Sequence, residues 1–157
     1  MRSRRPGKTM VLFGLLLGGF SACSSVLVST PISKKAEGWA VTLGQVKQGP
    51  DEYVGDITTV VAGPNENLIW TLLTVKNQGS EAQMFSYENC MLEAGEVSRR
   101  PLVVDRNEPE IKTAADRVEG FNPGQERTRE LVYSFPEKLR PARMKCETVV
   151  FPIPAPR

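Results

Sequence analysis

Carboxylates are the side chains of this sequence most capable of chemistry, and a loose group of them lies between residues 105 and 119: Asp105, Glu108, Glu110, Asp116 and Glu119. Paired carboxylates carry out acid–base chemistry in glycoside hydrolysis, and carboxylate oxygens are the ligands that Ca²⁺ prefers. Basic residues alternate with these acids, and the ligand spacing of a calcium-binding loop is absent. We therefore favour a solvated charged face over an ion site, and keep a carboxylate-dependent hydrolase of envelope or extracellular material as the alternative function.

The sequence contains no histidine. This removes the usual general base near neutral pH, the usual partner of a serine or cysteine nucleophile, and the commonest metal ligand. The sequence also lacks a nucleophile elbow, a phosphate-binding loop and a dinucleotide glycine motif. We expect a non-enzymatic protein with no catalytic, cofactor-binding or metal-binding residues.

The start of the chain has a distinctive order of residues. Basic residues precede an apolar run from Met10 to Leu17, which is followed by Gly18-Gly19-Phe20-Ser21-Ala22-Cys23-Ser24. This order resembles a bacterial lipoprotein signal, in which residues 1–22 are removed and Cys23 becomes the lipid-modified first residue. The resemblance implies a lipid-anchored envelope protein. Because Ser24 rather than Asp follows the cysteine, it also implies the periplasmic face of the outer membrane in a cell with two membranes.

Two other interpretations of this segment stay open. An uncleaved anchor would have to continue to Val28, although glycines and serines interrupt that stretch before it reaches the length of a bilayer core. A plain secretory signal would leave Cys23 unmodified, and Phe20 stands where lipoprotein signals usually carry Leu. Arg4-Arg5 lacks the apolar residues that follow a twin-arginine pair, so we expect the ordinary secretory route.

Removing residues 1–22, which hold four basic and no acidic side chains, changes the formal net charge from +2 to −2. This charge gives no support to a nucleic-acid partner.

The remaining 135 residues suit one domain. We expect a lipidated N-terminus and flexible tether over 23–38, a β domain over 39–151, and a Pro-rich tail over 152–157.

Cys90 and Cys146 are the remaining cysteines. Export would place them in an oxidising compartment, where pairing into a disulfide is the default. Such a bridge closes a loop of about 57 residues and constrains the unfolded chain by about 4 kcal/mol in the entropic model.

Alternation of apolar and polar residues predicts several strands. The predicted strands are 39–47, a central strand 68–75, 82–92, a strand over 131–135 that ends at Pro136, and a last strand over 142–151. Apolar residues at helical spacing favour a short helix over 108–118, with an ordered loop as the alternative. The fold class is all-β, an antiparallel β-sandwich.

Aromatic side chains within apolar patterns are expected in the core: Trp39, Trp70, Phe85, Tyr133 and Phe135. Tyr53 and Phe121 lie near turn residues, and we expect them to be exposed. An exposed sheet edge would allow a partner strand to pair with the domain.

Three segments resemble the immunoglobulin-like domains of small secreted and lipid-anchored bacterial proteins of unknown function. They are a strand that ends in Val75-Lys76-Asn77-Gln78-Gly79-Ser80, the turn Phe121-Asn122-Pro123-Gly124-Gln125, and the strand Leu131-Val132-Tyr133-Ser134-Phe135-Pro136. The antibody pattern itself is not met, because both tryptophans precede Cys90. The resemblance implies an extracytoplasmic sandwich that serves as a binding or scaffold module with an envelope partner, and it supplies no catalytic residue.

Overall fold

The computed structural model of the protein describes residues 25–108 and 112–155. These residues form fourteen strands and one 3₁₀ turn: β1 (Ser25–Val28), β2 (Ile32–Ala36), β3 (Trp39–Gln48), β4 (Glu52–Val54), β5 (Thr59–Val61), β6 (Glu66–Asn77), β7 (Gln83–Ser86), η1 (Tyr87–Asn89), β8 (Cys90–Ala94), β9 (Val97–Arg99), β10 (Val103–Asp105), β11 (Val118–Phe121), β12 (Glu126–Pro136), β13 (Arg143–Cys146) and β14 (Val149–Pro152). In this part of the chain, no helix has the length and apolarity that crossing a membrane requires.

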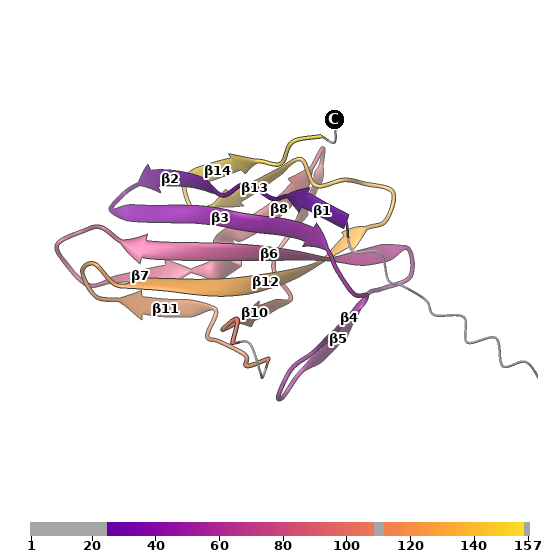
Figure 1. Cartoon of the computed structure of the whole chain (residues 1–157), viewed down its shortest axis with the longest axis horizontal. Coiled ribbons are helices and arrows are strands. Elements are labelled where there is room, and N and C mark those ends of the chain that lie inside the picture. Colours follow the sequence, from indigo (N-terminus) through magenta and orange to yellow (C-terminus); the bar gives the residue numbers. More distant parts are fainter. Residues whose placement is uncertain (1–24, 109–111, 156–157) are drawn as a thin grey trace, which may run out of the picture.

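The larger sheet has the strand order β1-β3-β6-β12-β10, and β2 also pairs with β3. All of its pairs are antiparallel. β6 lies between β3 and β12, as Figure 1 shows, which confirms the predicted central strand over 68–75. β12 ends at Pro136, as predicted, because proline lacks the N–H that would continue the ladder.

A second layer faces this sheet and is built from β11-β7 and from β14-β13-β8-β9. Apolar side chains of both layers pack into one buried core. They include Val41, Leu43, Leu73, Val75, Leu131 and Tyr133 from the larger sheet, and Phe85, Cys90, Leu92, Phe121, Met144 and Phe151 from the second layer. The predicted all-β antiparallel sandwich is therefore confirmed.

The N-terminal part of the described chain differs from the expected flexible tether over 23–38. Ser25–Val28 and Ile32–Ala36 both pair with β3 in the larger sheet. The sequence does not reveal the pairing of β2, because this strand pairs through main-chain hydrogen bonds and has no buried apolar face. Cys23 and Ser24 lie outside the described residues.

The short helix over 108–118 is wrong for the described residues, because 112–117 form no helix. Ala114 instead forms an isolated antiparallel bridge with Asp105, and the Ala115 N–H donates to the Val104 carbonyl (2.9 Å). The edge of β10 thus satisfies the backbone groups that a helix would have paired internally.

The C-terminal prediction also needs correction. The single strand expected over 142–151 is a hairpin of β13 and β14, in which Cys146 pairs with Val149. Part of the expected tail continues the fold, because Ile153 is buried and its N–H donates to the Ala142 carbonyl (2.8 Å).

Candidate binding surface

The β4–β5 hairpin covers part of the outer face of the larger sheet. In Figure 1 it lies below the ends of β6 and β12. Tyr53 is paired with Val60, and both side chains point towards the sheet. They take part in a second buried cluster made by Tyr53, Leu68, Trp70, Val103 and Val132, with Val60 and Ala62 packed against it. The sandwich therefore has a small core on its outer face in addition to its main core.

A hydrogen bond joins this hairpin to β10. Tyr53 Oη donates to Asp105 Oδ2, and both side chains are fully buried. The other carboxylate oxygen, Oδ1, accepts the Asn107 N–H (2.7 Å). Burial, together with the hydrogen bond to Asp105, raises the pKa of Tyr53, so this phenol stays protonated near neutral pH. The backbone at Gly55 lies close to the ring, since a Cβ there would come within 2.8 Å of it.

Trp70 belongs to this second buried cluster, and two lysines lie over its ring. The Nζ atoms of Lys47 and Lys112 lie 5.7 and 5.5 Å from its ring centroid, within cation–π range. Both lysines also pair with the carboxylate of Glu130, at 3.4 and 2.6 Å. These contacts link β3, the segment after residue 111, and β12 beneath the hairpin.

Backbone contacts hold the tip of the hairpin. The Asp56 N–H donates to the Lys112 carbonyl (2.9 Å), and Asp56 Oδ1 accepts the Ala114 N–H (3.3 Å). Inside the loop, the Gly55 N–H donates to the Thr58 carbonyl (2.8 Å). The hairpin is therefore fixed at its tip as well as at Tyr53.

The opposite face of this hairpin carries apolar side chains into solvent. Val54 is 59% exposed, Ile57 80% and Val61 63%. Val54 pairs with Thr59 and Val61 with Glu52, so these positions lie on the face away from Tyr53 and Val60. A rigidly held element thus presents three apolar side chains that the fold leaves uncovered, which is the arrangement of a binding surface.

The structure brings Glu108, Asp116 and Glu119 of the predicted carboxylate group to one groove and places Asp105 elsewhere. Asp105 is buried under the hairpin, whereas Glu119 is buried on β11 and pairs with Arg129 (2.7 Å). An open groove of about 590 Å³ is lined by Glu108, Asp116 and Glu119 together with Arg106, Val118, Gly120, Arg127 and Arg129. Glu110 lies outside the described residues. In the described part of the chain, no set of acidic or cysteine side chains gathers in a way that would hold a metal ion.

Two arginines and a tyrosine surround the carboxylate of Glu119. Arg129 contacts both of its carboxylate oxygens, Arg127 lies 3.5 Å from Oε2, and Tyr87 Oη donates to the same oxygen (3.3 Å). Arg127 also stacks over the ring of Phe121, 5.1 Å from its centroid. These contacts occupy both carboxylate oxygens of Glu119 and connect β11 to β12 and to η1.

The predictions for aromatic residues divide into two groups. Trp39, Trp70, Phe85, Tyr133 and Phe135 are buried, as predicted. The predicted exposure of Tyr53 and Phe121 is wrong, because both are buried. Phe121 makes edge contacts with Trp39 and Phe85, and Tyr53 packs beside Trp70. The alternation Glu52-Tyr53-Val54 was the signal for a strand, although nothing in it shows that Tyr53 faces a second core.

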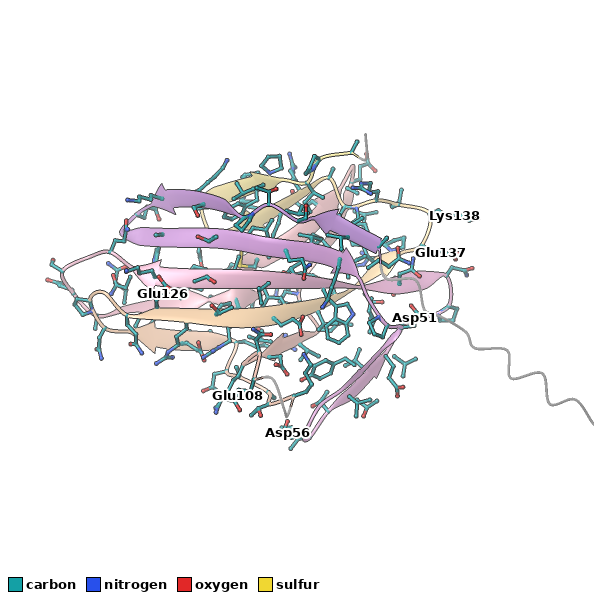
Figure 2. The ribbon with its side chains drawn as sticks, viewed as in Figure 1. Asp51, Asp56, Glu108, Glu126, Glu137 and Lys138 are labelled. Carbon is teal, nitrogen blue, oxygen red and sulfur yellow. A yellow bond between two sulfur atoms is a disulfide. The ribbon has the colours of Figure 1, made fainter. Side chains whose placement is uncertain are left out.

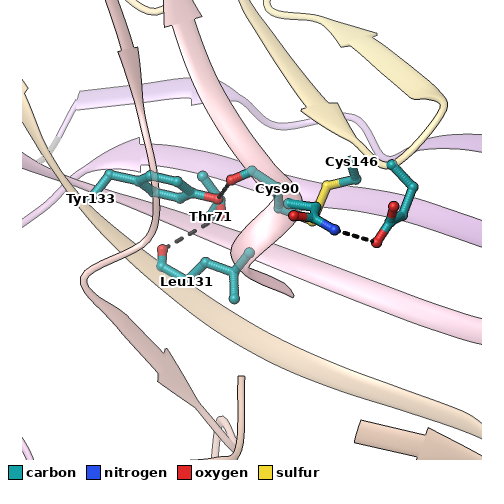
Figure 3. The surroundings of a disulfide bond; sticks show 7 residues. Thr71, Cys90, Leu131, Tyr133 and Cys146 are labelled. Atoms are coloured by element: carbon teal, nitrogen blue, oxygen red, sulfur yellow. Dashed lines mark hydrogen bonds between the residues drawn. A yellow bond between two sulfur atoms is a disulfide. The ribbon is translucent and has the colours of Figure 1, made fainter. Parts of the chain in front are cut away.

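The predicted disulfide between Cys90 and Cys146 is confirmed. The two residues are directly opposed on the neighbouring strands β8 and β13, so the bridge lies within one sheet. Figure 3 shows Tyr133 beside it, and Tyr133 Oη donates to the Cys90 carbonyl (2.8 Å). This hydrogen bond connects the bridged strands to β12 in the facing sheet. Cys23, the predicted acylation site, lies outside the described residues.

No protein-family profile and no curated protein sequence matches this chain. Among solved structures, the chain is similar to a functionally unknown protein from Listeria monocytogenes EGD-e. The similarity has a TM-score of 0.54 and 14% sequence identity, and it covers 85% of this chain and 89% of the other. At this identity the likeness concerns the fold alone, and the class that it supports is a small all-β, antiparallel sandwich.

Proposed function

We propose that this protein is a lipid-anchored bacterial envelope protein, attached through Cys23, whose β-sandwich binds or braces another envelope component. The observation that carries the binding role is the β4–β5 hairpin, which is fixed on one face, exposes Val54 and Val61 on the other, and exposes Ile57 at its tip. The signal-like N-terminus supports the anchoring, and the Cys90–Cys146 disulfide supports an oxidising compartment.

The hairpin suits binding for two physical reasons. It is already ordered by the Tyr53–Asp105 hydrogen bond and by the contacts of Asp56, so a partner does not have to supply the entropy cost of ordering it. Within the described residues, β4 and β5 pair only with each other, so each retains an edge to which a partner strand can add.

Two of the acidic residues considered for the hydrolase alternative are engaged by other side chains, whereas Glu108 and Asp116 line the open groove. Asp105 is hydrogen-bonded to Tyr53, and Glu119 is surrounded by Arg127, Arg129 and Tyr87. A general acid or nucleophile must be free to meet its substrate. The ordered hairpin with its exposed apolar side chains therefore gives a binding module the stronger support.

Mass spectrometry of the mature N-terminus tests the anchoring. We expect acyl chains on Cys23 and a protein that sediments with membranes, whereas Cys23→Ser should lose both properties. A native protein that retains residues 1–22, or that carries no fatty acid, contradicts the anchoring.

Crosslinking in intact cells tests the binding role. The hairpin variant Val54→Ser/Ile57→Ser is compared with Val150→Ser, a control that alters an exposed valine of β14. We expect one envelope component to crosslink to the wild type and the control, with at least a tenfold loss in the hairpin variant. Equal recovery from all three proteins, or the absence of any specific partner, contradicts the proposal.

A further inference from the structure

Very little chain separates the proposed acylation site from the folded domain. Cys23 stands two positions before Ser25, the first residue of β1. An extended chain spans at most about 3.5 Å per residue, so the Cα of Ser25 can be at most about 7 Å from that of the acylated Cys23. Ser25 is itself fixed in the larger sheet, opposite Gln48 at the end of β3. The end of the sandwich that contains Ser25 must then meet the membrane.

The surface beside Ser25 contains a hollow of about 210 Å³. Ser25 and Leu27 line one side, and Lys138, Leu139 and Arg140, from the segment after β12, line the other. In Figure 2, Lys138 lies at the end of the molecule at which Figure 1 shows β1 beginning. Two apolar side chains are open to solvent here, Val26 at 52% and Leu139 at 42% exposure.

Of the two basic side chains of this surface, Lys138 is exposed and Arg140 is half-buried. Arg140 is held against the C-terminal segment, because its Nη2 donates to the Pro154 carbonyl (2.8 Å), and its Nε is buried without a partner among the described residues. Lys138 is therefore the cation of this surface that is open to a headgroup phosphate. Glu137 and Asp51 are also at this end of the molecule in Figure 2, so attraction to anionic lipid is not the main source of affinity. The acyl anchor would supply the affinity, and this surface would set the orientation.

We propose that the end of the sandwich made by Val26 and residues 137–141 is a membrane-docking surface for phospholipid headgroups. Leu139 enters the interfacial region of the bilayer, and Lys138 meets the headgroup phosphates. This inference rests on the lipid anchoring proposed above, and it adds a fixed orientation of the domain on the bilayer.

Tryptophan quenching by brominated lipid tests this orientation. Full-length acylated protein is purified from membranes and reconstituted into vesicles of phosphatidylethanolamine and phosphatidylglycerol with brominated acyl chains. The probe is Leu139→Trp and the matched control is Met84→Trp, at a 65% exposed position. Met84, on β7, lies near the N-terminal end of β3, whereas Ser25 lies opposite Gln48 at its C-terminal end. The side chain of Gln83, the neighbour of Met84, lies beside Gly38, immediately before Trp39. The native Trp39 and Trp70 are buried and give the same background in both proteins.

We expect quenching of the tryptophan introduced at 139 to exceed that of the control several-fold. In the Leu139→Trp background, Lys138→Glu should reduce the quenching, whereas Lys35→Glu, an exposed change on β2, should not. If Leu139→Trp does not fold, as judged by circular dichroism, Lys138→Trp provides a second probe position.

Mass spectrometry of the same samples separates the two proposals. Acylated protein in which positions 139 and 84 are quenched equally overturns the docking surface and leaves the anchoring intact. Protein without an acyl chain overturns both.

Discussion

The hydroxyl of Tyr53 donates to the carboxylate of Asp105, across 52 positions of sequence and in a fully buried setting. This hydrogen bond connects β4 to β10, two strands that belong to different sheets. The hairpin is consequently part of the folded domain rather than an independent loop, and its outer face can present apolar side chains without collapsing onto the sandwich.

Replacing Tyr53 by phenylalanine should lower the free energy of unfolding by about 1–3 kcal/mol, because Asp105 stays buried and loses a hydrogen-bond donor. Urea denaturation followed by circular dichroism measures the change. Ser98→Ala, which removes a long exposed hydrogen bond to Glu93 (3.5 Å), serves as a control that should change stability by less than about 0.5 kcal/mol. Equal effects of the two substitutions would show that the Tyr53 hydroxyl does not stabilise the hairpin.

The pair between Glu119 and Arg129 should contribute more than a surface ion pair, since its side chains are 8% and 11% exposed. Arg129→Met should destabilise the protein by about 2–3 kcal/mol, below the full cost of breaking a buried pair because Arg127 still contacts Glu119. Lys76→Met is the control, because the Lys76–Glu126 pair is solvent-exposed and should contribute at most about 1 kcal/mol. If Arg129→Met and Lys76→Met have the same denaturation midpoint, the Glu119–Arg129 pair contributes no more than an exposed ion pair.

Loss of the Cys90–Cys146 bridge should be costly. The bonded residues are 56 positions apart, and on the entropic model removing the cross-link lowers stability by about 4 kcal/mol. The double variant Cys90→Ala/Cys146→Ala is compared with the wild type by thermal and urea unfolding, with and without reductant. Reductant should destabilise the wild type and leave the variant unchanged; an unaltered wild-type midpoint after confirmed reduction would contradict this expectation.

Alkaline unfolding should be linked to the tyrosines. All three tyrosines of the chain are buried, and burial raises the pKa of each above its ordinary value of about 10. Because the unfolded chain then loses these protons more readily than the folded chain, stability should be complete below pH 10 and should fall as the pH rises beyond it. Phenolate absorbance should therefore appear together with the loss of near-ultraviolet circular dichroism. Ionisation of any tyrosine well before unfolding would show that its ring is accessible.

The strands with strong apolar patterns could be predicted from the sequence. The central strand around Leu68–Val75 and the end of β12 at Pro136 follow from side-chain alternation and from the missing proline N–H. The turn at Pro123–Gly124 was also visible: Gly124 has φ +77°, and the Gln125 N–H donates to the Asn122 carbonyl (3.0 Å), as a type II turn requires.

Features that depend on tertiary contacts were not visible. Asn77 reads as a turn residue in the sequence, yet it is fully buried, and its Nδ2 donates to the carbonyls of Glu81 (2.7 Å) and Phe121 (3.0 Å). It thereby joins two turns that are 44 positions apart. The helical spacing near residue 114 failed for a related reason, because β10 offers that segment an edge with which its backbone can pair.

The hairpin surface illustrates the same limit. Periodicity shows that Tyr53 alternates with Glu52 and Val54, but it does not show which face meets the sheet. The second core beneath Tyr53 forms only when Leu68, Trp70 and Val132, from two adjacent strands, are brought together. Burial of Tyr53 and exposure of Val54 are therefore consequences of topology.

The pairing of both β1 and β2 with β3 has a practical consequence for producing the protein. A recombinant version that starts at Trp39, where the apolar pattern begins, would lack both strands and leave the long β3 as a bare edge. Such an edge is a template for self-association, so that product should precipitate or form aggregates. A soluble preparation should instead retain every residue from Ser25 onwards.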